Sequence, residues 1–244
     1  MEDVIVTGVS TGIGHALAKL MLQRGFRVLG MSRRAPVDLI QVPNFHFRSI
    51  DLARSDAVAG ALRAWVVEEL QVRQLKYLFL NAGLFGQRIA PVRAVPAAEI
   101  DYIMRVNVWS NRHILDALLN GAVGIDTCLV SSSIAGVRAR AGNSGYAISK
   151  AALNMMMKLY ALECPATYFA VLGLCNVDTF LSRTILTLPL DGAFPEQEKL
   201  RERGVRPGYL DTADKRAADI DRLLQGELQA RVPSGEFAEI RSLI

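Results

Sequence analysis

The sequence predicts an α/β protein with a doubly wound, seven-stranded parallel sheet and helices on both faces. Short apolar runs rich in β-branched residues, such as Val4-Ile5-Val6, are typical of buried parallel strands. Stretches with apolar residues at helical spacing alternate with these runs, which is the pattern of parallel sheets. The chain has 244 residues, of which 51% are hydrophobic, and this is enough for one domain of this class. The alternation predicts right-handed crossovers and a site at the carboxyl ends of the strands.

Seven strands are expected in chain order: Val4–Thr7, Arg27–Met31, Asn44–Ser49, Leu75–Leu80, Thr127–Ser131, Tyr168–Leu174 and Glu236–Arg241. The helical stretches between them include His15–Gln23, Ala57–Leu70, a helix from Pro96 through Asn107 to Leu119, and the helix that holds Tyr146. Because no linker or repeat divides the chain, residues 1–244 are expected to form a single domain.

Three glycines follow the first strand directly, in the run Thr7-Gly8-Val9-Ser10-Thr11-Gly12-Ile13-Gly14. A strand, a glycine-rich turn and a helix bring free backbone N–H groups and a positive helix end against a pyrophosphate. Glycines are needed because side chains would block the close approach of phosphate, and of helix to strand. A tight turn without a ligand is the alternative. The spacing favours a dinucleotide site.

Tyr146 and Lys150 lie four residues apart on a predicted helix, so their side chains share one face. The lysine charge is expected to lower the pKa of the phenol from about 10 toward a working range for an acid. Such a pair occurs on many ordinary helices, and it gains meaning only from the motifs that precede it.

Together these motifs resemble the short-chain dehydrogenase/reductase family over essentially the whole chain. The cofactor turn of the family reads T-G-x-x-x-G-I-G, as the Gly8–Gly14 run does, and Asn81-Ala82-Gly83 follows an apolar strand. Asn107 lies in a helical stretch, and Ser133 precedes Tyr146 by the thirteen residues that are common in the family. The resemblance implies a Rossmann fold and an NAD(P)-dependent oxidoreductase.

The resemblance also assigns catalytic roles to four residues. Tyr146 would donate a proton to a carbonyl oxygen while nicotinamide delivers hydride to the carbon. Lys150 would lower the pKa of the tyrosine and bind the nicotinamide ribose, and Ser133 would polarise the carbonyl. Asn107 would support a water chain that leads protons to solvent.

Two of these assignments have alternatives. Asn107 could simply bond to a neighbouring backbone group. Ser131 and Ser132 compete with Ser133, which is preferred for its spacing and because Ile-Ala-Gly follows it, as in the family.

The end of the second strand predicts NADP(H) rather than NAD(H). A carboxylate there would bind the ribose 2′-hydroxyl and repel a 2′-phosphate, but this chain has Ser32-Arg33-Arg34. A guanidinium grips phosphate through two charge-assisted hydrogen bonds. The alternative is that both arginines point to solvent, and Thr11 stands where many NADP-dependent relatives carry a second basic residue.

Further cofactor contacts follow from the resemblance. They are Gly8, Ser10, Thr11, Gly12, Ile13 and Gly14 in the turn, Asp51 and Leu52 at the adenine, Asn81, Ala82 and Gly83 on the other side, and Val177 and Thr179 near the nicotinamide, with Tyr146 and Lys150. One departure concerns Leu174-Cys175, which stands where the family has Pro-Gly. Because cysteine lacks the freedom of glycine at positive φ, we expect either a different bend of the backbone here or a changed nicotinamide pocket.

The segment from Phe180 to Gly208 is rich in proline and glycine and interrupts the strand–helix pattern. By resemblance, this segment is expected to be a mobile substrate lid. A surface excursion without a role is the alternative.

Composition limits the other classes of function. The net charge is +4 and the calculated pI is about 9.1, but the basic residues are scattered, so no nucleic-acid partner is expected. No long apolar run or leader is evident, and the three cysteines have neither C-x-x-C nor metal-site spacing, so no membrane or metal partner is expected. A soluble, cytoplasmic protein with reduced thiols is predicted.

The leading hypothesis is therefore an NADP(H)-dependent carbonyl reductase acting on a small ketone or aldehyde, or on a secondary alcohol in reverse. The resemblance implies a homodimer or homotetramer. Short matches, such as Ser234-Gly235-Glu236-Phe237, are similar to the sepiapterin reductase and benzil reductase subgroup. The alternative is a dinucleotide-binding sensor or scaffold with little turnover.

Overall fold

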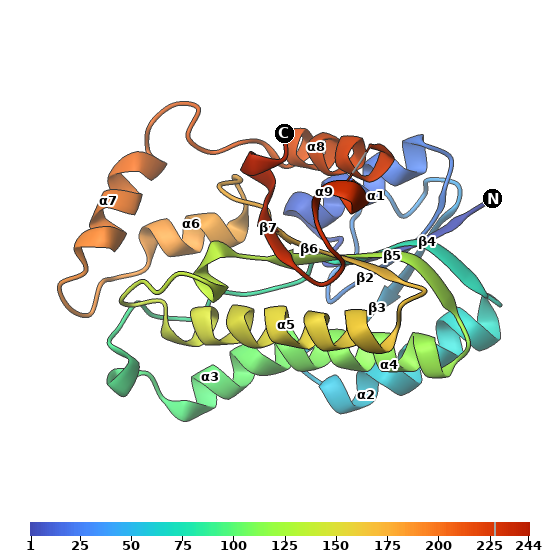
Figure 1. Cartoon of the computed structure of the whole chain (residues 1–244), viewed down its shortest axis with the longest axis horizontal. Coiled ribbons are helices and arrows are strands. Elements are labelled where there is room, and N and C mark those ends of the chain that lie inside the picture. The colour runs from blue at the N-terminus through green and yellow to red at the C-terminus, as the bar shows by residue number, and fades with distance from the viewer. Residues whose placement is uncertain (227) are drawn as a thin grey trace.

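A computed structural model describes residues 1–226 and 228–244, with the backbone alone at Ser55 and Asp56 (Figure 1). Its centre is a seven-stranded, wholly parallel sheet with the strand order β3-β2-β1-β4-β5-β6-β7. The strands are β1 (Asp3–Thr7), β2 (Arg27–Ser32), β3 (Phe45–Ser49), β4 (Gln74–Leu80), β5 (Gly124–Ser132), β6 (Tyr168–Gly173) and β7 (Phe237–Glu239). The predicted fold class is confirmed, and each predicted strand is present with ends that differ by a few residues.

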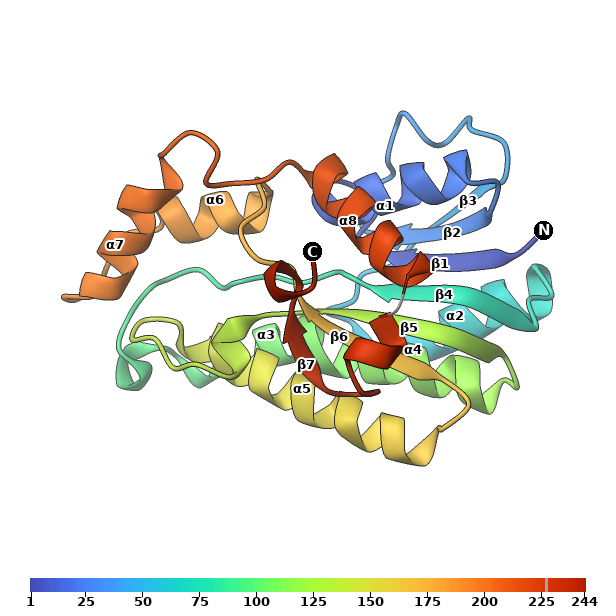
Figure 2. The same ribbon diagram turned by 45° about the horizontal axis from the view of Figure 1, so that its top comes forward.

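Helices cover both faces of this sheet (Figures 1 and 2). One face carries α1 (Gly12–Gln23), α8 (Ala213–Gln225) and α9 (Leu228–Arg231), and the other carries α2 (Ser55–Leu62), α3 (Ala97–Met104), α4 (Ser110–Asn120) and α5 (Ser144–Glu163). Two π-helical segments, Arg63–Glu69 and Arg105–Trp109, continue α2 and α3 respectively, and the second leads directly into α4. Short 3₁₀ turns occupy Val92–Ala94, Ile134–Gly136 and Ile240–Ser242.

The alternation of side chains along the buried strands produces two cores. In β1, Ile5 packs toward the α2–α5 layer, whereas Val4 and Val6 pack toward α1 and α8. All three side chains are fully buried. A strand that is apolar on both faces therefore lies at the middle of the sheet, as the sequence pattern indicates.

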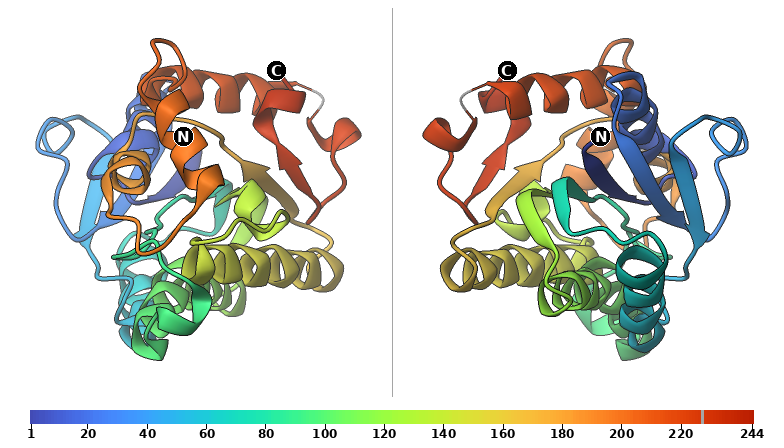
Figure 3. Two further views of the ribbon diagram at one scale, coloured as in Figure 1. Left: turned by 90° about the vertical axis from the view of Figure 1, so that its left-hand side faces the viewer. Right: turned by 90° about the vertical axis from the view of Figure 1, so that its right-hand side faces the viewer.

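The segment from Phe180 to Gly208 differs from the long loop that the sequence suggests. It contains two helices, α6 (Phe180–Thr187) and α7 (Pro195–Gly204), which lie beyond the carboxyl ends of the strands (Figure 3). The Thr179 hydroxyl caps α6 by accepting from the Ser182 amide, and Pro195 begins α7. The prolines and glycines of this segment thus begin, end and separate helices.

Candidate active site

A large cavity of about 1400 Å³ lies at the carboxyl ends of the strands. The turn after β1, the ends of β2, β4, β5 and β6, the start of α5 and the two helices α6 and α7 contribute to its walls. This is the place that the order of strands predicts for a ligand, because the connections diverge there. All predicted site residues line this cavity except Gly14 and Asn107.

The glycine-rich turn has the conformation that its sequence requires. Gly8 and Gly12 have positive φ angles of 77° and 65°, which side chains disfavour. A Cβ on Gly14 would lie 2.4 Å from the Gly8 carbonyl oxygen, so only glycine lets α1 approach β1 this closely. The side chain of Thr11, the N-cap residue of α1, caps none of the described amides. The first N–H groups of α1 can therefore bind an anion, and the turn fits a dinucleotide pyrophosphate.

Thr7 braces the opposite wall of the cofactor end, and sequence reasoning missed it. Its buried hydroxyl accepts hydrogen bonds from the amides of Asn81 and Ala82, each at 2.9 Å, and donates to the Phe79 carbonyl oxygen. The Asn81 side chain in turn accepts from the Ser131 hydroxyl at 3.1 Å. The available signal was a hydroxyl residue at the carboxyl end of an otherwise apolar strand.

Tyr146 and Lys150 share one buried face of α5, as their spacing predicts. Their side chains are 8% and 4% exposed, and the lysine Nζ lies 5.6 Å from the centre of the phenol ring. The Lys150 ammonium donates to the Ser131 carbonyl oxygen at 2.7 Å. Burial lowers the pKa of Lys150 to about 8.

The pKa of Tyr146 moves in the direction opposite to the prediction. Burial raises the pKa of this phenol above its usual value, and the nearby Ser133 hydroxyl only partly opposes that shift. The expected net lowering of this pKa was wrong, because burial is the largest cause of the shift and it disfavours the charged phenolate. The phenol therefore holds its proton at neutral pH.

The three neighbouring serines have different partners. The Ser131 hydroxyl bonds to Asn81, and the Ser132 hydroxyl donates to the Asn154 side chain. Ser133 begins a 3₁₀ turn, and its oxygen accepts from the Ala135 amide at 3.1 Å. Of the three serines, only Ser133 is a cause of the pKa shift of Tyr146, and its hydrogen bond lowers that pKa.

Asn107 lies behind the cavity, in the π-helical segment Arg105–Trp109, and is fully buried. Its Nδ2 donates to the Leu84 carbonyl oxygen at 2.9 Å and to the Ser149 hydroxyl at 3.0 Å, while its Oδ1 accepts from the Leu84 amide at 2.9 Å. The side chain thus makes the backbone contacts of the alternative interpretation and holds Leu84, in the loop that follows β4. The water chain stays a prediction. Such π-helical segments are often found at functional sites.

Because the ammonium of Lys150 is buried, we expect it to lower the stability of the folded protein by an amount that depends on pH. A shift from 10.5 to about 8 corresponds to about 3 kcal/mol at neutral pH, and the bond to Ser131 returns about 1 kcal/mol. We expect Lys150→Met to raise the free energy of unfolding by about 2 kcal/mol at pH 7.

The size of this effect changes with pH in a defined window. Below pH 8 the lysine is charged in both the folded and the unfolded chain, and the cost is complete. Between pH 8 and 10.5 only the unfolded chain holds the proton, so the wild type gains stability as the pH rises. Urea unfolding at pH 7 and pH 10 measures the difference. An advantage of the variant that is equal at both pH values would contradict it.

The cofactor end of the cavity is positively charged. Arg33 and Arg34 follow β2, are exposed and line the cavity, and neither forms an ion pair within the described part of the chain. Asp51 and Leu52 also line the cavity, and their contact with the adenine stays a prediction. The Ser32 hydroxyl donates to the Arg34 carbonyl oxygen at 2.7 Å and holds the turn that carries both guanidiniums.

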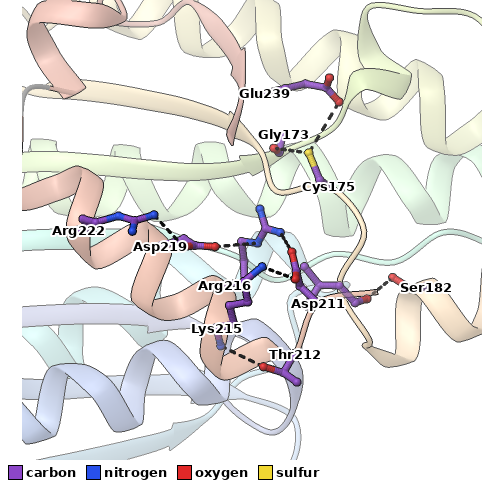
Figure 4. A network of polar contacts seen from close by, with 11 residues as sticks. Gly173, Cys175, Ser182, Asp211, Thr212, Lys215, Arg216, Asp219, Arg222 and Glu239 are labelled. Atoms are coloured by element: carbon purple, nitrogen blue, oxygen red, sulfur yellow. Dashed lines mark hydrogen bonds and ion pairs between the residues drawn. The ribbon is translucent and has the colours of Figure 1, made fainter. Parts of the chain in front are cut away.

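Cys175 keeps the backbone path that a glycine would take. Its φ angle is +60°, in the left-handed region that side chains disfavour, so the expected rearrangement of the backbone does not occur. The side chain lies toward β7, with Sγ 3.5 Å from the Gly173 carbonyl oxygen and 3.8 Å from Glu239 Oε1 (Figure 4). The preceding Leu174 is buried in the core beside α8. The backbone at Cys175 therefore has the conformation of a glycine, and the cysteine side chain makes that conformation strained.

The strain at Cys175 can be measured. A left-handed residue with a Cβ costs about 1–2 kcal/mol, and this cost is common to cysteine and alanine. We expect Cys175→Gly to be more stable than the matched Cys175→Ala by about 1 kcal/mol. Chemical denaturation of the two variants gives this difference directly. Equal stability, or a more stable alanine variant, would show that the position is not strained.

A buried arginine fastens the run that comes after Cys175. The backbone of Asp211 pairs with Asn176 and Asp178, and its carboxylate accepts from the Arg216 guanidinium at 2.5 Å (Figure 4). Arg216 is 1% exposed and also lies 3.9 Å from Asp219. This network joins the start of α8 to Val177. Sequence reasoning missed it because the pairing joins segments more than thirty residues apart.

The segment that contains α6 and α7 helps to bury the phenol. Tyr146 packs with Phe85, Ile89 and Phe194 in a small apolar cluster, and its ring centre lies 5.3 Å from that of Phe85. Side chains of α6 and the following loop surround this cluster. The raised pKa of Tyr146 thus arises from residues that come from four separate segments.

The fold and this arrangement define an oxidoreductase of the type that binds a nicotinamide dinucleotide at a glycine-rich turn. The sequence model of the short chain dehydrogenase family matches residues 2–185. The chain belongs to the short-chain dehydrogenase/reductase family. Among the described residues, no helix is long and apolar enough to cross a membrane.

Relatives and solved structures agree with this membership. D-erythrulose reductase of Gallus gallus is 31% identical over 244 residues, which cover 98% of this chain and 84% of that protein. The NADPH-dependent 3-dehydrocapnine reductase of Ornithobacterium rhinotracheale is 30% identical over 63% of this chain and 57% of its own. The chain spans about two thirds of related oxidoreductases of Myxococcus xanthus and Listeria monocytogenes. A short-chain dehydrogenase/reductase of Saccharomyces cerevisiae has the same fold, with a TM-score of 0.81 and 21% identity over 98% of this chain and 96% of that one.

Proposed function

We propose that the chain is an NADP(H)-dependent reductase of small ketones or aldehydes, with Tyr146 as the acid. The observation that carries this proposal is the buried, protonated phenol beside Ser133 and Lys150, in the same cavity as the glycine-rich turn. When bound, the nicotinamide supplies the hydride.

The residues of the chain supply the proton and the orientation. Tyr146 donates its proton to the carbonyl oxygen, and the Ser133 hydroxyl holds that oxygen as negative charge develops on it. The phenol carries its proton at neutral pH, so reduction can start from this state, whereas oxidation of an alcohol would first require the phenolate. Because the raised pKa by itself makes Tyr146 a weaker acid, the hydrogen bond from Ser133, which lowers that pKa, assists the transfer. Lys150 binds the ribose and Asn107 positions the segment that leads from Asn81 to Leu84.

The choice of NADP(H) rests on Arg33 and Arg34. Their guanidiniums are exposed at the cavity wall, where a 2′-phosphate would meet them. One relative is itself described as NADPH-dependent, and two are described as reductases. NAD(H) is the less favoured cofactor.

Other features extend the proposal. We treat residues 1–244 as one catalytic domain in which segment 180–208 acts as a substrate lid. We also propose a homodimer or homotetramer, because apolar side chains of α5, including Met155, Leu159 and Leu162, are exposed on its outer surface. The sepiapterin/benzil reductase subgroup and the cytoplasmic location stay predictions. The alternative of a scaffold without turnover relied on Leu174-Cys175, and the positive φ of Cys175, which a glycine would also adopt, argues against it.

The test is a panel of ketones and aldehydes incubated with the protein and NADPH. Loss of absorbance at the reduced nicotinamide band should accompany formation of the alcohol. Tight binding of NADPH with no consumption over a broad panel would instead favour a dinucleotide-binding protein.

A further inference from the structure

We propose that the carbonyl substrate carries an anionic oxygen group, a carboxylate or a phosphate, which Arg138, Arg140 and Arg203 bind at the outer end of the cavity. This inference rests on the proposed reductase activity and adds the chemical class of its substrate. Arg138 and Arg140 lie on the loop between β5 and α5, and Arg203 lies in α7. All three line the cavity that also contains Ser133 and Tyr146.

The inference depends most on the surroundings of Arg140. Its side chain is only 20% exposed, and its Nε is buried without a hydrogen-bond partner among the described residues. The nearest carboxylate is Glu196, whose Oε2 lies 3.7 Å from that Nε, too far for a hydrogen bond. The Glu196 side chain is itself 68% exposed and well hydrated. Arg140 lines the cavity, and its one ion pair within the described chain, with Glu196, is long and leaves the Nε without a hydrogen bond. A buried N–H without a hydrogen bond is costly, and an anion bound beside the guanidinium would lower that cost.

The neighbours of Arg140 add positive charge. Burial, with the charges of Arg138 and Arg203, lowers the pKa of Arg140, and Glu196 and Tyr209 oppose this only in part. Neither Arg138 nor Arg203 forms an ion pair in residues 1–226 and 228–244. Exposed arginines are common on protein surfaces, so Arg138 and Arg203 alone do not indicate a ligand. The only ion-pair partner that these three arginines have among the described residues is the distant carboxylate of Glu196. An anionic ligand explains this excess of positive charge better than hydration does.

The other charged pair at this end is already satisfied. Arg88 Nε lies 3.0 Å from Glu99 Oε2, and the other oxygen of Glu99 accepts from the Gln87 amide. Glu99 is therefore not available to neutralise the three arginines. The excess of positive charge at the substrate end belongs to Arg138, Arg140 and Arg203.

The spacing of the arginines is set by the fold. The buried Gln197 side chain of α7 donates to the Asn143 side chain and to the Ala141 carbonyl oxygen, so α7 is fastened to the loop that carries Arg138 and Arg140. Backbone bridges join Ala90 to Asn143 and Ile89 to Leu190 in the same region. Because the two backbone segments that carry the arginines are held together before binding, only the side chains must be ordered when the anion arrives.

Matched substrates test the inference in the wild type. The probes are 4-formylbenzoate against methyl 4-formylbenzoate, and 4-formylphenyl phosphate against 4-methoxybenzaldehyde, each with NADPH. We expect kcat/KM to be about tenfold higher for the charged member of at least one pair, mainly through KM, and the preference to fall in 0.5 M salt. The pair with the larger ratio shows whether carboxylate or phosphate is preferred. Ratios near one for both pairs would overturn the inference.

Three variants locate the effect. Arg140→Gln should lower kcat/KM for the charged member by about tenfold and leave the neutral member within about twofold. Arg203→Gln, at an exposed position, should act in the same direction if Arg140→Gln does not fold. The matched control is Arg206→Gln, which removes the same charge just beyond α7 but does not line the cavity. An equal effect of the control would mean that net charge, not this site, is responsible.

A binding measurement separates this inference from the proposed function. Calorimetric titration with 4-acetylbenzoate and 4-acetylphenyl phosphate requires no turnover. In the presence of NADP⁺, the wild type should bind at least one of them about tenfold more tightly than Arg140→Gln does. If no carbonyl is reduced but this difference is found, the reductase activity fails and the anion site stands. If carbonyls are reduced and neither anion distinguishes the two proteins, the anion site fails.

Discussion

Replacing Tyr146 with phenylalanine is expected to lower kcat for carbonyl reduction by about 10²–10⁴-fold, the usual contribution of a positioned acid. The change removes only the hydroxyl. The ring stays buried against Phe85, so the fold and the binding of NADPH should change little. Steady-state kinetics with NADPH, together with a titration of NADPH binding, separate the two effects.

The matched control for this variant is Tyr77→Phe. Tyr77 packs near Phe26 and Phe79 on the other side of the sheet and does not line the cavity. It should retain full activity. Turnover of Tyr146→Phe within a few-fold of the wild type would mean that another group supplies the proton.

The double variant Arg33→Ala/Arg34→Ala is expected to weaken NADPH binding by about 100-fold, because each charge-assisted hydrogen bond to a phosphate contributes about 1.5–3 kcal/mol. Binding of NADH should change by less than about threefold, since it has no 2′-phosphate. Fluorescence titrations with both nucleotides give the ratio of the two dissociation constants.

A control with the same change in charge is Arg93→Ala/Arg206→Ala, at two exposed positions outside the cavity. It should leave the ratio as in the wild type. Equal weakening of NADPH and NADH by Arg33→Ala/Arg34→Ala would contradict a 2′-phosphate contact and place both arginines in solvent.

The sheet could be predicted because its strands are local in sequence. Runs such as Val4–Val6 are apolar on both faces, and only a strand in the middle of a parallel sheet buries both faces. The pairing of Tyr146 with Lys150 also follows from helical spacing alone. The close approach at Gly14 follows from the glycine pattern after the strand.

The properties that could not be predicted depend on contacts between distant segments. The pKa of Tyr146 rises because Phe85 and Phe194 bury the phenol, and neither position is marked in the sequence. At Cys175 we expected either a different bend of the backbone or a changed nicotinamide pocket. The positive φ of Cys175 argues against the different bend, and the pairing of Val177 with Asp211 holds the backbone that follows; the changed pocket stays a prediction. The prolines and glycines of segment 180–208 suggested a loop, because helix ends and loops use the same residues.

Hydride transfer can be followed directly with NADPH deuterated at the reactive face of C4. For any carbonyl compound that the protein consumes, we predict one deuterium on the carbinol carbon of the product, seen by mass spectrometry, in the wild type and almost none with Tyr146→Phe. Binding of NADPH with no deuterated alcohol from any member of the panel would contradict a reductase centred on Tyr146.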